Sequence, residues 1–279
     1  GTQYTVPLDI HGNAMYYNTD LLDKYDANTF LDDDVVTIEE ILSLDGKLDE
    51  GQYAINNALI EWVTLANVVN AGGDISDEAG NPTINTDAMR SVVEQLKSVA
   101  DAGLMSPYGE DGYAMFQSGD VLFSTDGTWT STAHGSVEGL NFGVTNIYSV
   151  TPDKFTNRSS AHLFSLLNNE DRTDEKEQGV ADFLSWMREN SLDWAGAGQI
   201  VASKEVFESE EYQQYPQSFF TSSDVEKEAS YIFDYKYYSY VESALGTVLS
   251  DMIYGNITID EGLDQAQKTV EDLIAENAS

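Results

Sequence analysis

Residues 7–22, which read PLDIHGNAMYYNTDLL, restrict the possible folds more than any other stretch of this sequence. Aromatic and β-branched residues from Tyr4 to Leu8 indicate a strand, and the apolar run from Ala14 to Tyr17 indicates a second strand. Polar residues, including Asp9 and His11, and a glycine interrupt the pattern between them. We expect this break to hold a carboxylate and an imidazole at the ends of packed strands, where a rigid scaffold can direct them at a ligand. Two strands joined by a turn, with no ligand, fit the spacing equally well.

The composition indicates a globular protein with a sizeable core. The chain has 279 residues, of which 41% are hydrophobic and 11% aromatic, enough for one large domain or two lobes. It contains no cysteine, which excludes disulfides, thiolate chemistry and zinc–cysteine sites. No run approaches the roughly 18 apolar residues that a membrane-spanning helix needs.

The strong negative charge limits the possible partners. Asp and Glu number 49 against 13 Lys and Arg, a formal net charge of −36. Nucleic acids and anionic membranes are bound through clustered cations, so we expect neither as a partner. Most of the carboxylates are expected on a solvated surface, and a halophilic or an acid-exposed origin would produce the same bias.

Hydrophobic periodicity and capping residues indicate alternating helices and strands. Two capping boxes, at Thr37 and at Thr258, mark helix starts. The expected helices cover residues 37–44, 59–70, 86–102, 113–117 and 173–188, a segment ending near residue 254, and a last helix from residue 258. The expected strands after the first two are 121–124, 141–145 and 161–167.

Motifs for enzymatic or metal chemistry are weak or missing. The sequence has no P-loop, no G-x-S-x-G, no H-E-x-x-H and no G-x-G-x-x-G. The acidic loops 32–34 and 74–81 lack the ligand spacing of a calcium loop, and we expect no metal and no cofactor. Of the three histidines, we expect His134 on the surface and His162 packed within a strand, which leaves His11 as the candidate for a ligand contact.

Five stretches, in order, carry a resemblance to a known family. They are MYYNTDLLDKY after the Pro7 strand, EWVTLANVVNAGG (61–73), AMFQSGDVLFSTDGTW (114–129), NFGVTNIY (141–148) and YGNITIDEGLDQAQ (254–267). This set resembles the family 1 extracellular solute-binding proteins, the carbohydrate receptors of ABC importers that include the maltodextrin-binding proteins. The resemblance implies an α/β, periplasmic-binding-protein-like (type II) fold of two lobes.

The resemblance also implies a domain division. Residues 1–13 would form a strand and the first hinge, 14–150 the second lobe, 151–195 a segment returning to the first lobe, and 196–279 the C-terminal helices of the second lobe. Members usually open with βαβ units of the first lobe, which are absent here, and neither a signal sequence nor a lipid-attachment cysteine is present. We therefore expect a C-terminal fragment with weak sugar affinity and an exposed apolar face at Phe183, Trp186 and Met187. A full-length parent is expected to be a monomer outside the cell, either a cell-surface lipoprotein or a periplasmic protein.

Several positions match ligand contacts in the resembled family. His11, beside Asp9, falls where maltodextrin-binding relatives place an acidic ligand contact near the first hinge. Trp62 and Trp129 fall at aromatic platform positions, where an indole ring can cover the C–H face of a pyranose while its hydroxyls bond to polar groups. Both tryptophans would be core residues if no ligand binds.

Three further residues complete the candidate set. Asp126 lies at a strand end of the kind where α/β folds collect ligands. Tyr238 and Tyr240 belong to a tyrosine-rich segment that matches the third aromatic contribution of the family less closely.

The sequence supports one main function and two alternatives. The main function is capture of an oligosaccharide between two lobes, without catalysis, and its delivery to the membrane permease subunits of an ABC transporter. A glycoside hydrolase with two carboxylates is one alternative. A peptide or polyamine receptor on the same fold is the other, favoured by the negative charge.

Overall fold

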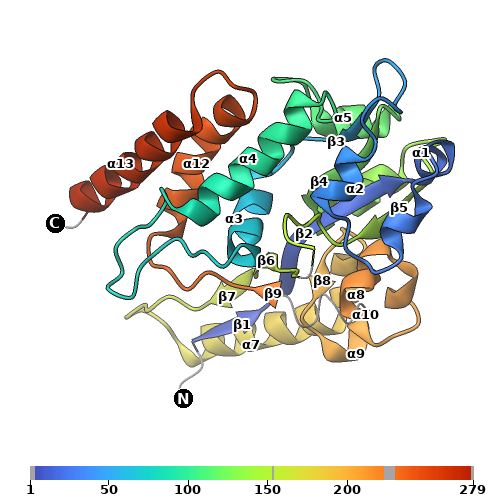
Figure 1. Ribbon diagram of the computed structural model, residues 1–279. Helices are drawn as coiled ribbons and strands as arrows, with labels where there is room; N and C mark the ends of the chain where they lie inside the picture. Colours follow the sequence, from blue (N-terminus) through green and yellow to red (C-terminus); the bar gives the residue numbers. More distant parts are fainter. Residues whose placement is uncertain (1–3, 153, 223–229, 278–279) are drawn as a thin grey trace.

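The computed structural model describes residues 4–152, 154–222 and 230–277 as a mixed α/β fold (Figure 1). Residues 1–3, 153, 223–229 and 278–279, which fall in the expected segments 1–13, 151–195 and 196–279, lie outside the described residues. The strands are β1 (Thr5–Pro7), β2 (Asp9–Asn18), β3 (Tyr53–Ile55), β4 (Val121–Gly127), β5 (Phe142–Thr145), β6 (Asn157–Ser160), β7 (Leu163–Ser165), β8 (Ile200–Val201) and β9 (Ser230–Tyr231).

The helices are α1 (Thr19–Lys24), α2 (Ile38–Leu42), α3 (Ile60–Asn70), α4 (Asp87–Asp101), α5 (Gly112–Gln117), α6 (Ser131–Gly135), α7 (Asp174–Glu189), α8 (Ser191–Ala195), α9 (Lys204–Phe207), α10 (Phe219–Ser222), α12 (Tyr238–Ile253) and α13 (Ile259–Asn277). The seven expected helices form within a few residues of their expected ends, and the short helices α1, α6, α8, α9 and α10 were not expected. The capping box at Thr37 is formed, because its hydroxyl accepts from the Glu40 amide and Glu40 accepts from the Thr37 amide. No helix within the described parts of the chain is both long and apolar enough to cross a membrane.

Strand β2 is the centre of the larger sheet. The order of that sheet is β3-β4-β2-β6-β9, with β5 and β8 also paired to β2. The C-terminal half of β2 pairs with β4 and β5, whereas Asp9 and Ile10 pair with β8, and His11 and Gly12 with β6. β1 pairs with β7 in a separate two-stranded sheet.

The expected break between two strands is wrong in one respect, because the polar residues lie inside β2 itself. β8 and β6 supply backbone partners for residues 9–12, so the strand continues through them. Glycine suits this position, since a Cβ on residue 12 would make a tight contact of 3.1 Å with the carbonyl oxygen of Arg158.

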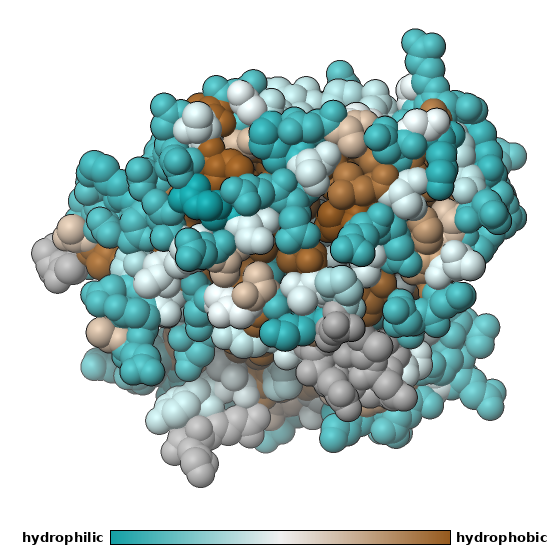
Figure 2. Space-filling model, in the orientation of Figure 1, coloured by the Kyte–Doolittle hydropathy of each residue, from teal (hydrophilic) through white to brown (hydrophobic). Residues whose placement is uncertain are grey.

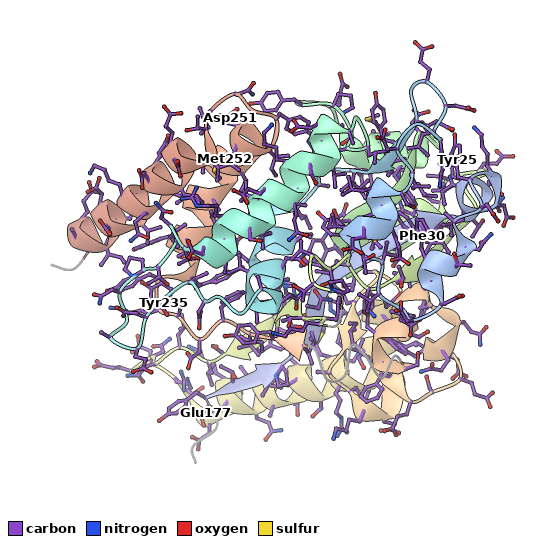
Figure 3. The ribbon with its side chains drawn as sticks, in the orientation of Figure 1. Tyr25, Phe30, Glu177, Tyr235, Asp251 and Met252 are labelled. Atoms are coloured by element: carbon purple, nitrogen blue, oxygen red, sulfur yellow. The ribbon has the colours of Figure 1, made fainter. Side chains whose placement is uncertain are left out.

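The main core lies between the sheet and a group of four helices, α3, α4, α12 and α13, which pack side by side in Figure 1. Met252 of α12 is fully buried, and a Cβ at Gly262 of α13 would overlap its side chain, so the glycine permits the close approach of the two helices. The neighbouring Asp251, near the end of α12 (Figure 3), is partly exposed and accepts a hydrogen bond from the hydroxyl of Tyr108.

The surface is mainly polar, as the composition predicts. Figure 2 shows hydrophilic residues over most of the visible face. Among the described residues, Asp9 and Asp126 are the only buried carboxylates. Both were candidate site residues in the sequence, and all other described acidic residues are at least partly exposed.

Helix α7 leaves Phe183 and Trp186 exposed, as expected, whereas Met187 is partly buried. No residue of α7 is buried, and Phe183 and Trp186 keep 48% and 56% of their surface accessible. The helix lies beside β1 at the bottom of Figure 1. Val6, Phe164, Leu184 and neighbouring residues line a groove of about 380 Å³ between α7, β1 and β7.

Candidate ligand-binding site

Asp9 joins three segments of the chain that are far apart in sequence. It opens β2, and its side chain is fully buried. The indole Nε1 of Trp194, in α8, donates to Oδ2 over 2.7 Å, and the backbone amide of His162 donates to Oδ1 over 3.1 Å. The Nδ1 atoms of His162 and His11 lie 2.9 and 3.4 Å from Oδ1. The carboxylate therefore ties β2 to the connection between β6 and β7 and to α8.

The Asp9 carboxylate is charged at neutral pH. Burial acts to raise its pKa, but the hydrogen bonds from His11, His162 and Trp194 outweigh burial and lower the pKa to about 2. The site thus contains a buried anion whose oxygens are held in fixed directions.

Four rings form a continuous row that begins at this carboxylate. The rings of His162 and His11 are 4.5 Å apart with an angle of 34° between their planes. His11 meets Trp129 edge to face at 5.8 Å, and Trp129 meets Trp62 in the same way at 5.8 Å. The structure therefore brings together Asp9, His11, Trp62 and Trp129, which sequence comparison placed in one site. We call the rings of residues 11, 62, 129 and 162 the ring row.

A tight turn fixes the position of Trp129. The residue lies in the 3-10 turn Thr128–Thr130, directly after β4. Its ring lies over Gly127, where a Cβ would come within 2.1 Å of the indole. The backbone of Gly127 is extended, a conformation that any residue can adopt, so the close approach of the ring is what favours glycine here. The hydroxyl of buried Tyr16 donates to the carbonyls of Gly127 and Thr128, at 2.9 and 3.1 Å, and holds the turn from the other side.

Arg158 of β6 closes the far end of the ring row and was missed by the sequence analysis. Its guanidinium carbon lies 4.0 Å from the centre of the Trp62 ring, and its Nε donates to the hydroxyl of Tyr238 over 2.8 Å. Nη2 lies 3.6 Å from the Glu242 carboxylate. Nη1 is buried and has no hydrogen-bond partner within the described part of the chain. The sequence predicted no strand at this position, and one arginine among 13 basic residues carries no signal of a binding role.

Glu61 adds a second carboxylate near Arg158. Burial raises its pKa, the charge of Glu242 raises it further, and Arg158 lowers it. This end of the ring row therefore carries both hydrogen-bond donors and acceptors.

Tyr238 belongs to this end of the site, and Tyr240 does not. Tyr238 contacts Arg158 and stacks on Phe233 at 5.4 Å, and burial raises its pKa. Tyr240 stacks on Tyr237 at 5.6 Å and packs against the main core. No ring contact among the described residues joins Tyr240 to the ring row.

Asp126 lies on the other side of β4. It pairs with Ala14 of β2, and its charge acts on Tyr16 and Tyr113. Burial raises the pKa of Asp126 to about 6. The hydrogen bond from the Gly127 amide acts to lower this pKa, and the charge of Asp111 acts to raise it. The structure gives Asp126 no contact with the ring row.

The other two histidines differ from expectation. His134 was expected on the surface, which is wrong, because it is fully buried among the rings of Tyr16, Tyr113, Phe116 and Phe142. Burial lowers its pKa to about 4. His162 lies in the connection after β6 and not in a strand, and its side chain is 56% exposed.

A hollow of about 530 Å³ lies along β2 and reaches Thr128, but no residue of the ring row lines it. Its walls are mostly apolar and include Ile10, Phe207 and Phe220. Asn13 and Thr128 also line it, and their buried side-chain polar atoms have no partner among the described residues. Polar groups without partners inside a hollow are suited to bind a ligand or water.

Solved structures with the same fold are numerous but distant in sequence. The cyclic α-maltosyl-1,6-maltose binding protein of Arthrobacter globiformis matches 99% of this chain over 73% of its own length, with a TM-score of 0.77 and 17% identity. The maltose/maltodextrin-binding domain of Bdellovibrio bacteriovorus, bound to maltotriose, matches 98% of this chain over 73% of its own, with a TM-score of 0.76 and 16% identity. The ABC substrate-binding protein of Listeria monocytogenes, in complex with cycloalternan, matches 98% of this chain over 72% of its own length, with a TM-score of 0.78 and 15% identity.

These likenesses establish the periplasmic-binding-protein-like fold. The comparison with curated protein sequences found no match. The sequence profile of the family described as bacterial extracellular solute-binding protein matches residues 1–221. Members of that family are non-enzymatic solute receptors of ABC importers. The match covers more than half of the residues of this chain, which therefore belongs to the bacterial extracellular solute-binding protein family.

Proposed function

We propose that the solute is an oligosaccharide and that it binds on the ring row. One observation carries the proposal, namely that Trp62 and Trp129 meet edge to face, with hydrogen-bonding groups at both ends of the row. An indole face covers the C–H face of a pyranose, while the hydroxyls around the sugar seek carboxylates, imidazoles and guanidinium groups. Such alternation of apolar and polar surface suits a neutral sugar of more than one unit.

The residues have distinct roles in this proposal. Trp129 is the main stacking surface, because Arg158 already lies against one side of Trp62. At one end His11, which the buried carboxylate of Asp9 holds in place, bonds to a sugar hydroxyl. At the other end the free Nη1 of Arg158 donates to a second hydroxyl. Tyr238 holds Arg158 in place. We do not assign direct contacts to Asp126 or Tyr240, which have no contact with the row.

The distant structures are consistent with this proposal. The three solved proteins bind a cyclic maltosyl-maltose, maltotriose and cycloalternan, respectively. At 15–17% identity they share the fold with this chain, so the sugar must be found by experiment. We further propose that the bound sugar is delivered to the permease subunits of an ABC importer, and that the receptor acts as a monomer at the cell surface or in the periplasm.

A ligand-detected measurement tests the proposal. Saturation-transfer difference NMR detects binding even near 1 mM, a free energy of about −4 kcal/mol, and so tolerates a weak receptor. The panel contains linear and cyclic gluco-oligosaccharides, a peptide mixture and spermidine. Chromatography of each sugar after incubation shows whether it is returned intact.

A matched pair of variants locates the site. Trp129→Ala removes the proposed stacking surface, and Trp186→Ala removes an exposed tryptophan on α7 as the control. We expect the sugar signal to disappear only in Trp129→Ala. A signal for spermidine and none for any sugar would support the polyamine alternative and refute the proposal.

A further inference from the structure

We propose that Asp9, His11 and His162 form a binding site for a single divalent transition metal ion of the Zn²⁺ class. These three residues can each direct one donor atom to a common point, and the three donor atoms lie within 4.8 Å of one another. The inference does not depend on sugar binding, and it departs from the expectation that the chain binds no metal.

The distances are close to those of a metal site. With bonds of about 2.0–2.1 Å, two donors of a tetrahedral zinc site are about 3.3 Å apart. From Asp9 Oδ1 to Nδ1 the distances are 3.4 Å for His11 and 2.9 Å for His162. The ion takes the place of the protons between these atoms, and each imidazole binds through Nδ1 while Nε2 carries the proton. The three donor atoms, which lie within 4.8 Å of one another, have to shift to reach this spacing, and the His162 side chain is exposed enough to turn.

The carboxylate is held as metal-binding carboxylates are. Trp194 Nε1 donates to Oδ2, and the backbone amide of His162 donates to Oδ1. Such outer hydrogen bonds orient a ligand and stabilise its charged form. The cluster supplies one negative charge and two neutral nitrogens, and exposed His162 leaves a side open for water or another ligand.

The donor set selects the class of ion. Imidazole nitrogens with one carboxylate suit Zn²⁺, Co²⁺, Ni²⁺ and Cu²⁺, whereas Ca²⁺ and Mg²⁺ prefer oxygen ligands only. A bound ion would link β2 to the connection between β6 and β7, next to the ring row at Trp129, where His11 is 5.8 Å from the indole. The metal would therefore stiffen the centre of the fold beside the proposed sugar site.

The experiment titrates the whole chain with Zn²⁺ by calorimetry and with Co²⁺ by visible absorption, using Ca²⁺ as the probe for binding to carboxylates alone. The ligand variants are His162→Gln and His11→Gln. Trp194→Phe removes only an outer hydrogen bond, and Asp32→Asn, in an exposed acidic run, is the control for surface carboxylates.

We expect one Zn²⁺ per chain, a tetrahedral Co²⁺ spectrum and a rise in melting temperature with Zn²⁺. His162→Gln and His11→Gln should each weaken affinity by more than about 100-fold, and Trp194→Phe by about 10–100-fold, the usual effect of an outer-shell partner. Asp32→Asn should change nothing. Because His162 is exposed, its variant should fold even if the His11 variant does not. Equal Zn²⁺ affinity in His162→Gln and the parent chain, or Ca²⁺ binding as strong as Zn²⁺ binding, would overturn the proposal.

Discussion

Replacing Asp126 by asparagine should stabilise the protein at neutral pH and leave ligand binding unchanged. Asp126 is 8% exposed, and burial raises its pKa from 3.8 to about 6. Asparagine has the same shape and can still accept the hydrogen bond that the Gly127 amide donates over 2.7 Å. The substitution therefore removes a buried charge without removing its partner.

The sign and size follow from linkage between protonation and folding. Because the pKa is higher in the folded chain than in the unfolded chain, the folded state binds the proton more tightly, and stability falls as pH rises from about 4 to about 6. The gap between 3.8 and about 6 corresponds to about 3 kcal/mol lost above pH 6, at 1.36 kcal/mol per pKa unit. Asp126→Asn should recover up to about that amount at pH 7 and nothing at pH 4.

Urea unfolding at several pH values between 4 and 8 measures the difference. Asp32→Asn, at an exposed position, is the control and should stay within about 0.5 kcal/mol of the parent chain. NMR titration with the best sugar of the panel should give equal affinity for Asp126→Asn and the parent. A variant that is less stable at pH 7, or whose difference is the same at pH 4 and pH 8, would refute the account of Asp126. Loss of sugar binding would show that Asp126 contacts the ligand.

The remaining predictions concern the ring row, Arg158 and α7. Gly127→Ala should displace the Trp129 ring and weaken sugar binding by about 30-fold, equivalent to about 2 kcal/mol, with little change in melting temperature. If the variant binds the sugar as tightly as the parent chain, the Trp129 ring is not held over Gly127. Arg158→Gln should destabilise the fold by about 3 kcal/mol in denaturant titrations, because it leaves Glu242 without its cation; no loss would mean that the pair is irrelevant to stability. Amides of α7 should exchange with deuterium at least about tenfold faster than those of α4, since α7 buries no residue and α4 buries five; equal protection in a monomer would contradict the exposed face.

The sequence predicts the local features of this protein well. The 3.6-residue stripe and the Thr86 cap place α4 at Asp87–Asp101, within one residue of expectation at each end, because both signals act along the chain. The strand before Trp129 was also expected, and the structure extends it to Gly127. Alternation and capping depend on neighbours in sequence, so they can be read without a structure.

Contacts between distant segments could not be read in the same way. Arg158 meets Trp62 and Tyr238 only because β6 packs against α3, close to the start of α12, and a lone arginine carries no sign of this. His134 was expected on the surface because histidine is usually polar, yet four aromatic rings enclose it. The side of β4 on which Asp126 lies depends on its pairing with β2, which no local pattern specifies.

The most direct test of the central claim compares sugar binding in the parent chain, Trp129→Ala and Trp186→Ala by saturation-transfer difference NMR. The account predicts that an oligosaccharide receives saturation from the parent chain and from Trp186→Ala, that the signal is lost in Trp129→Ala, and that the sugar is recovered intact. Equal signals from all three proteins, or hydrolysis of the sugar, would contradict the assignment of this chain as a carbohydrate receptor that binds its ligand on the ring row.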